Sequence, residues 1–138
     1  MSAESKILNG ICSLLYRREY RRFTSPCDIG KIQTEYLLKL LQKNSETVYG
    51  RKYGFGSIQS YEDFAEKVPL SVYEDYEPYI RAMADGERGV LTKEEVLLFE
   101  LTSGSSGSKK LIPYTKTLKR EFQRGIKPWL YDIYAGVS

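Results

Sequence analysis

The chain has 138 residues, which is enough for one domain with a real core but small for two. Its 21 basic and 18 acidic residues nearly balance, so net charge indicates no particular partner. Histidine is absent, which excludes Ser/His/Asp triads, Cys/His dyads and histidine metal sites.

A first helix is predicted from Ala3 to about Arg22, and the following Thr-Ser-Pro sequence at 24–26 is expected to end it. The run Arg-Arg-Glu-Tyr-Arg-Arg at 17–22 could suggest RNA or an anionic membrane surface. Four arginines are too few for the footprint that nucleic-acid binding usually requires, so a solvated helix face is favoured. We therefore expect no nucleic-acid and no membrane partner. Apolar residues recur along this helix at helical spacing: Ile7, Leu8, Ile11, Leu14 and Leu15.

Two cysteines, Cys12 and Cys27, are too far apart in sequence for a CxxC motif and too few for a disulfide framework. They are interpreted as reduced, partly buried thiols of a cytoplasmic protein. The apolar patch from Ile7 to Leu15 is short and interrupted by polar residues, and no small-residue cleavage site follows it. Neither a secretory signal nor a membrane span is predicted.

A second amphipathic helix is predicted after Asp28, which offers an N-cap. It is expected to pack on the first helix or on the rest of a larger domain. Further along, Gly50 and Gly54 are predicted to mark a helix end and a turn. The apolar positions of the second helix follow one another at intervals of mostly three and four residues: Ile29, Ile32, Tyr36, Leu37, Leu40 and Leu41.

Two shorter helices are predicted next. Ser60 begins the first with a capping signal, and the Val-Pro-Leu sequence at 68–70 breaks it. The second starts at Ser71 or Tyr73 and stops at Gly86. Tyrosines recur along these segments, and aromatic residues at helical spacing are interpreted as core residues rather than as a platform for a ligand.

A loop of serines and glycines then separates two apolar, β-favouring runs. The first run is Val96 to Leu101, and the second extends from Lys110 to Tyr114. These runs predict a short β-hairpin in an otherwise mainly helical chain. Successive N–H groups and serine hydroxyls in such a loop can converge on phosphate oxygens, and a lysine adds a mobile positive charge.

Other interpretations of this loop fit the sequence less well. A Walker A loop needs a second glycine five positions after the first, but Lys109 stands five positions after Gly104. The dinucleotide fingerprint needs three glycines at fixed spacing, which are absent. A flexible Ser/Gly linker usually lies in polar surroundings, whereas apolar runs clasp this loop. A phosphate-binding loop is therefore favoured.

A final helical pattern follows the second run. Gly125 and Pro128 are expected to loosen or bend this helix midway. Trp129 is interpreted as a core residue rather than as a base-stacking one. The pattern is carried by Leu118, Phe122, Ile126, Trp129, Leu130 and Ile133.

The sequence Thr-Ser-Gly-Ser-Ser-Gly at 102–107, followed by Lys110 and Pro113, resembles the first nucleotide-binding motif of the adenylate-forming superfamily. With Thr115 included, it looks most like the auxin-responsive promoter family of acyl-acid amido synthetases. The segment 44–55, with its Tyr-Gly and Gly-Phe pairs, and the segment 61–80 are also similar to that family. Two departures are a serine at 105, where threonine is usual, and one residue fewer before Lys110.

Members of that family activate a carboxylic acid with ATP and pass the acyl group to an amino acid. The resemblance implies an α/β fold, of which residues 1–138 form a partial amino-terminal AMP-binding domain, mainly helical, with a short β-hairpin around a Ser/Gly phosphate loop. It implies ATP and Mg²⁺ as cofactors, with no metal ligand in this chain. It also implies a catalytic role for Lys110 and nucleotide binding by Thr102, Ser103, Gly104, Ser105, Ser106 and Gly107.

We therefore expect the amino-terminal part of such a synthetase, inactive by itself and prone to self-association through its apolar stripes. One alternative is another adenylate-forming ligase, such as one that makes acyl-CoA. A second is a non-catalytic helical fragment that binds a partner protein through its tyrosine-rich helices. Further nucleotide motifs in the reading frame after Ser138 would separate these possibilities.

Overall fold

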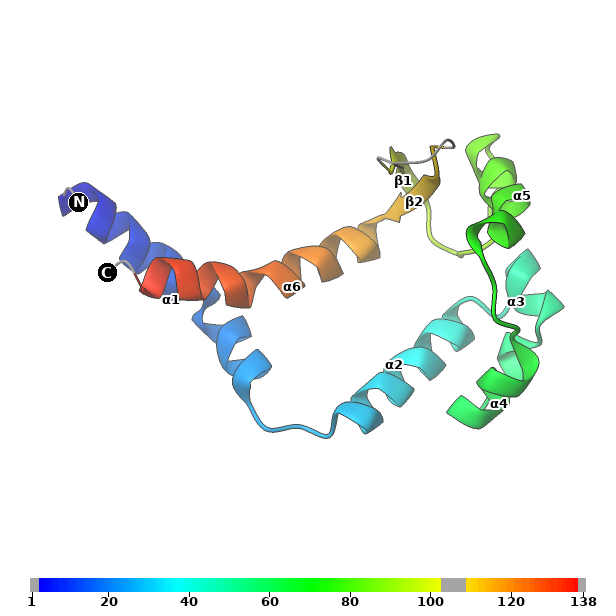
Figure 1. The fold of residues 1–138 in the computed structure, drawn as a ribbon, viewed down its shortest axis with the longest axis horizontal. Coiled ribbons are helices and arrows are strands. Elements are labelled where there is room, and N and C mark those ends of the chain that lie inside the picture. Colours follow the sequence, from blue (N-terminus) through cyan, green and yellow to red (C-terminus); the bar gives the residue numbers. More distant parts are fainter. Residues whose placement is uncertain (1–2, 103–108, 137–138) are drawn as a thin grey trace. The chain divides into compact units, whose positions relative to one another are not determined.

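The computed structural model describes residues 3–102 and 109–136, which fall into two compact units (Figure 1). One unit comprises Met1–Cys27 and Thr117–Ser138, and the other comprises Asp28–Lys116. The described residues are mainly helical with a two-stranded antiparallel sheet, as predicted. In chain order the elements are α1 (Ala3–Thr24), α2 (Ile29–Lys43), α3 (Val48–Lys52), the 3₁₀ turn η1 (Phe55–Ser57), α4 (Tyr61–Lys67), α5 (Tyr73–Ala84), β1 (Val96–Leu101), β2 (Leu111–Thr115) and α6 (Lys116–Ala135).

The first unit is a pair of helices, α1 and α6 (Figure 1). Stacked tyrosines join the two helices. The ring centroids of Tyr20 and Tyr131 are 4.2 Å apart, and those of Tyr16 and Tyr134 are 6.3 Å apart. Asp132 raises the pKa of the Tyr20 hydroxyl, chiefly through its negative charge. Helix α1 ends at Thr24, as the sequence predicted, and within this unit its partner is α6.

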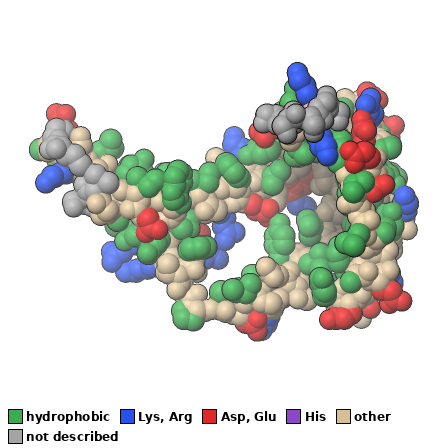
Figure 2. Space-filling view, viewed as in Figure 1, with side chains coloured by type: hydrophobic (Ala, Val, Ile, Leu, Met, Phe, Trp, Pro, Cys, Tyr) green, Lys and Arg blue, Asp and Glu red, His purple; other side chains and the backbone are tan. Residues whose placement is uncertain are grey.

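Much apolar surface of this unit is exposed, and Figure 2 shows hydrophobic side chains along both helices. Leu8, Ile11 and Leu15 share one stripe of α1 and are 60%, 53% and 69% exposed. Self-association of the chain through this stripe stays a prediction, which sedimentation at several concentrations would check.

Two interpretations made for this unit and its boundary were wrong. Trp129 is 63% exposed rather than part of a core. At 3.6 residues per turn it lies across α6 from Tyr131 and Tyr134, which make the contact with α1. Cys27 is exposed instead of partly buried, whereas Cys12 is half-buried, and both thiols are free.

The second unit begins with α2, whose start and end have different roles. Asp28 caps the helix as predicted, because its Oδ1 accepts a hydrogen bond from the backbone N–H of Lys31 at 3.0 Å. Ile29 and Ile32 near the start remain exposed, so α2 contributes mainly its last turns to the core. The buried apolar side chains of this unit are Leu41, Tyr49, Ile58, Ile80, Met83 and Val90.

A buried polar junction connects α2 to α3. The Thr47 hydroxyl is the N-cap of α3: it accepts from the backbone N–H of Gly50 at 2.9 Å and donates to the carbonyl of Asn44 at 2.7 Å. The Asn44 side chain accepts from the backbone N–H of Lys93 at 3.0 Å and donates to the carbonyl of Leu40 at 2.9 Å. The contact between Asn44 and Lys93 therefore ties the junction of α2 and α3 to a segment 49 residues further along the chain.

The prediction that Gly50 marks a helix end was wrong. Gly50 lies inside α3 and is buried. A Cβ at this position would stand 2.0 Å from the carbonyl oxygen of Asn44, so the close approach of two backbone segments requires glycine. Gly54 does mark a turn as predicted, with a φ of 64° in the left-handed region.

We expect Thr47→Val to lower the free energy of unfolding by about 2 kcal/mol, because it removes a helix cap and leaves a buried N–H without its acceptor. Valine has nearly the size of threonine, so packing changes little. Urea unfolding of the variant would measure the loss. Thr47→Ser, which keeps the hydroxyl, is the matched control, and an equal loss in both variants would contradict the role of the hydroxyl.

An aromatic cluster surrounds Tyr49, which is buried. The interpretation of the tyrosines at 61–79 as core residues is confirmed only in part: Tyr76 and Tyr79 are half-buried and join this cluster, whereas Tyr61 is 58% exposed. The Tyr49 ring lies 4.7–5.9 Å from the rings of Tyr53, Phe55, Tyr76 and Tyr79. Burial, followed by the 3.3 Å hydrogen bond with the Tyr76 hydroxyl, raises the pKa of Tyr49.

The predicted starts of α4 and α5 and the stop after α5 are confirmed. Ser60 caps α4 by accepting from the backbone N–H of Asp63 at 3.0 Å. Helix α5 starts at Tyr73, one of the two predicted positions. Gly86, with a φ of 99°, follows its end.

Candidate functional site

Strands β1 and β2 form the predicted hairpin in the second unit. Leu101 pairs with Leu111 and Val96 with Thr115, with an irregularity between Val96 and Leu98. The pairing continues one step beyond the strands, because the backbone N–H of Thr102 donates to the carbonyl of Lys110 at 3.0 Å. The two described ends of the Ser/Gly loop are thus held side by side.

The structure places two of the predicted site residues and leaves the others undescribed. Thr102 and Lys110 face each other across the base of the loop. The predicted phosphate-binding residues between them lie outside the described residues: Ser103, Gly104, Ser105, Ser106 and Gly107.

Lys110 has two partners on the first turn of α5. Its Nζ lies 4.9 Å from the centroid of the Tyr73 ring and 3.7 Å from Oε1 of Glu74. The Lys110 side chain is 42% exposed and that of Glu74 is 63% exposed, so water screens this ion pair. Such pairs contribute about 0–1 kcal/mol, which leaves the ammonium available to a stronger anion.

Tyr73 was missed as a functional candidate by the sequence analysis. Its hydroxyl accepts a hydrogen bond from the backbone N–H of Leu111 at 2.8 Å. The two residues are 38 positions apart, so no local pattern indicates the contact. The sequence showed only that Tyr73 could begin a helix.

A second cationic site surrounds Lys52, next to a cavity of about 470 Å³. The Lys52 ammonium donates to the hydroxyl of Tyr79 at 2.9 Å and lies 5.1 Å from the centroid of the Tyr53 ring. The hydrogen bond to Tyr79 raises the pKa of Lys52. The side chains of Tyr79 and Tyr53 therefore hold this lysine, and no site residue predicted from the sequence is among these three.

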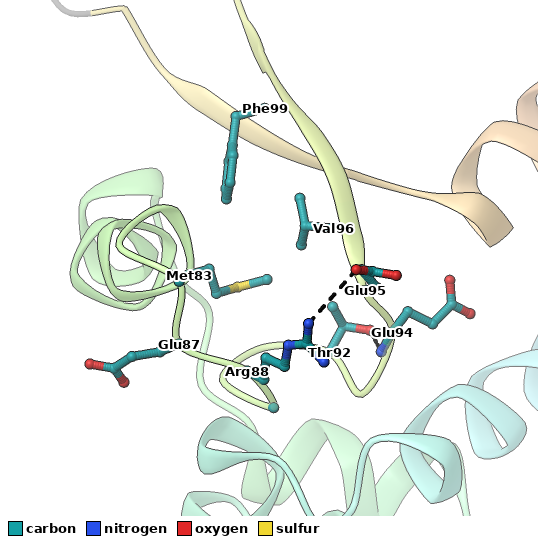
Figure 3. Close-up of a pocket in the computed structure, with 10 residues that line it drawn as sticks. Met83, Glu87, Arg88, Thr92, Glu94, Glu95, Val96 and Phe99 are labelled. Atoms are coloured by element: carbon teal, nitrogen blue, oxygen red, sulfur yellow. Dashed lines mark hydrogen bonds and ion pairs between the residues drawn. The ribbon is translucent and has the colours of Figure 1, made fainter.

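A smaller cavity of about 200 Å³ lies beside β1 (Figure 3). Val96, Phe99 and Met83 form its apolar wall, and Figure 3 shows the first two pointing towards the end of α5. Arg88 pairs with Glu95 at 3.8 Å across the opening. Carboxylates line this cavity beside its one arginine, so it offers no excess of positive charge to a phosphate.

A third hollow, of about 440 Å³, is mainly apolar and lies among α2, α3, α4, α5 and β2. None of the three cavities contains a metal site: residues 3–102 and 109–136 hold no group of three acidic or cysteine side chains that could bind a metal ion. Within the same residues, no helix is long and apolar enough to cross a membrane.

This arrangement, mainly helical with a small antiparallel hairpin, matches the amino-terminal region of solved acyl acid amido synthetases. The structure of such an enzyme, AtGH3.15 in complex with 2,4-DB, matches 90% of this chain with a TM-score of 0.66 and 27% sequence identity. The match covers 21% of that enzyme's chain. A second structure of GH3.15 matches 78% of this chain with a TM-score of 0.70.

The chain belongs to the GH3 family, because the model of the GH3 family N-terminal domain matches residues 17–137. It is 34% identical over 104 residues to a probable indole-3-acetic acid-amido synthetase, GH3.1, of Arabidopsis thaliana, covering 74% of this chain and 17% of that protein. It is 36% identical over 93 residues to the jasmonoyl-L-amino acid synthetase JAR6 of Nicotiana attenuata, covering 66% of this chain and 16% of that protein. The chain therefore spans about a sixth of the length of these relatives.

Proposed function

We propose that this chain is the amino-terminal part of an ATP-dependent synthetase that joins a carboxylic acid to an amino acid. The observation that carries the proposal is membership of the GH3 family, whose relatives are named as acid–amino acid synthetases. Those names also favour an amino acid over coenzyme A as the acceptor of the acyl group. Because the chain matches about a sixth of each relative, we assign it part of an AMP-binding domain and no activity by itself.

The reaction would proceed in two steps. A carboxylate oxygen of the acid attacks the α-phosphorus of ATP, which forms an acyl adenylate and releases pyrophosphate. The amine of the amino acid then attacks the acyl carbon, an amide bond forms, and AMP leaves. The first step needs positioning and charge neutralisation rather than a protein nucleophile, which suits a chain without histidine.

The loop would hold the β- and γ-phosphates of ATP. Pairing of Thr102 with Lys110 supports this role, because it brings the two ends of a short loop together beside a half-exposed ammonium group. Backbone N–H groups and hydroxyls would surround the phosphate oxygens, and Lys110 would stabilise the charge that develops during transfer. The residues assigned to nucleotide binding are Thr102, Ser103, Gly104, Ser105, Ser106 and Gly107.

Mg²⁺ would accompany ATP, but the described residues do not build a site for it. We also propose a cytoplasmic location, on the basis of two cysteines that are free thiols. The nearly balanced charge and the few arginines at 17–22 support the proposal of no nucleic-acid and no membrane partner.

ATP–pyrophosphate exchange by the full-length protein, the complete product of the reading frame that contains this chain, tests the proposal. A panel of acids should include indole-3-acetic acid, jasmonic acid and 2,4-DB, which the relatives' names suggest. We expect exchange that depends on at least one acid, and release of AMP that depends on an added amino acid. Exchange with no dependence on an acid would contradict the proposal. The 138-residue chain is the matched control, and we expect no exchange above background from it.

A further inference from the structure

The peptide group between Lys110 and Leu111 is fixed on both edges. Its carbonyl oxygen accepts from the backbone N–H of Thr102 at 3.0 Å, within the hairpin. Its N–H donates to the Tyr73 hydroxyl at 2.8 Å, outside the hairpin. The same hydroxyl lies 3.4 Å from the carbonyl oxygen of Leu111, to which it can donate. A strand on one side and a helix on the other thus determine the orientation of this single peptide.

The Tyr73 ring also supports the side chain that this peptide carries. The Lys110 ammonium lies 4.9 Å from the centroid of the Tyr73 ring. The same tyrosine thus contacts both this ammonium and the backbone N–H of Leu111. The screened ion pair with Glu74, at 3.7 Å, is a second weak contact of the same ammonium. Tyr73 therefore acts on both the backbone and the side chain of Lys110.

We propose that Tyr73 is a positioning residue for Lys110 in the adenylation step. This inference rests on the proposed function, because it concerns the lysine assigned there to the phosphates. Tyr73 is anchored as the first residue of α5, which starts at a fixed place: the Asp75 carboxylate accepts from the backbone N–H of Val72 at 2.9 Å. The hydroxyl sets the direction in which Lys110 leaves the backbone, and the ring limits where its ammonium can go. Tyr73 touches no reacting atom in this scheme and acts through Lys110.

Tyr73→Phe tests the role of the hydroxyl, because it keeps the ring. In the full-length protein we expect this change to lower the turnover number of pyrophosphate exchange about 10-fold, the size expected for one lost hydrogen bond. Tyr73→Leu, which also removes the ring, should lower it further. Tyr79→Phe is the matched control, because it also removes a tyrosine hydroxyl from α5. That hydroxyl accepts a hydrogen bond from Lys52 and not from the hairpin, so this change should leave pyrophosphate exchange unchanged.

The decisive readout combines Tyr73→Phe with Lys110→Ala. If Tyr73 acts through Lys110, the 10-fold loss should shrink to less than about 2-fold in the Lys110→Ala background. A purely structural effect would persist there, and an equal loss in both backgrounds would overturn the inference. No exchange by the unmodified protein would overturn the proposed function and this inference with it. Full exchange by Lys110→Ala would overturn the role of Lys110 and this inference, while acid-dependent exchange by the unmodified protein would still support the proposed function.

Amide hydrogen exchange gives a second measurement that does not depend on activity. In Tyr73→Phe, the Leu111 amide loses its acceptor and should exchange about 10-fold faster, while the Thr102 amide keeps its acceptor within the hairpin. Unchanged exchange at Leu111 would overturn the inference even if turnover falls.

Discussion

Lys110→Ala is expected to lower the turnover number of pyrophosphate exchange by the full-length protein about 100-fold or more, while ATP binding weakens much less. Charge accumulates on the phosphate oxygens as pyrophosphate leaves, so a positive group placed there stabilises the transition state more than the bound substrate. Loss of one such group costs roughly 3 kcal/mol. Steady-state exchange rates measured over a range of ATP concentrations would separate the two effects.

Lys109→Ala is the matched control for this prediction. The two lysines are adjacent and carry the same charge, but Lys109 is exposed, whereas Lys110 contacts Tyr73 and Glu74. We expect Lys109→Ala to leave turnover within about 2-fold of the unmodified protein, as is usual for a solvated surface charge. Equal losses in both variants would indicate a general effect of positive charge instead of a specific role for Lys110.

The sequence predicted the elements whose signals are local. The caps Asp28 and Ser60 act on N–H groups three residues away, so residue type and spacing were sufficient to identify them. The hairpin was predicted for a similar reason, because two β-favouring runs flank a loop of small residues. Lys110 was a candidate because the motif around it could be read directly from the chain.

The errors and omissions involve contacts that sequence spacing does not reveal. Tyr73 reaches Leu111 over 38 residues, and Asn44 reaches Lys93 over 49. Trp129 is apolar, and apolar character predicts burial only when a neighbouring element covers that side of the helix. Each of these features depends on which face of a helix packs against which distant segment of the chain. Packing within a unit decides this, and spacing along the sequence does not reveal it.

Gly50 shows how one residue type supports two opposite interpretations. Glycine commonly ends a helix because it tolerates a positive φ, and this suggested a stop. In the structure Gly50 lies within α3. Glycine is required there because the Asn44 carbonyl and the Thr47 hydroxyl approach too closely for any side chain. The first interpretation concerns the backbone angles of glycine itself, and the second concerns the atoms around it.

Gly50→Ala is therefore expected to lower the free energy of unfolding by about 3 kcal/mol or more, although alanine is the better helix former. The added Cβ would lie 2.0 Å from the Asn44 carbonyl oxygen and 2.9 Å from the Thr47 hydroxyl oxygen. Backbone would have to move, and the cap of α3 would be displaced with it. Urea unfolding followed by circular dichroism would measure the loss.

Gly30→Ala, in α2 of the same unit, is the matched control. A Cβ there would meet only Asp28 Oδ1 at 3.5 Å, an ordinary van der Waals distance, so this variant should gain up to about 1 kcal/mol from helix propensity. Amide hydrogen exchange would locate the effect of Gly50→Ala. The N–H groups of Val48 and Tyr49 donate to the carbonyls of Gly89 and Val90 at 2.9 and 3.0 Å, and both should lose protection if α3 shifts. Retained protection together with unchanged stability would contradict the close approach that makes glycine necessary at this position.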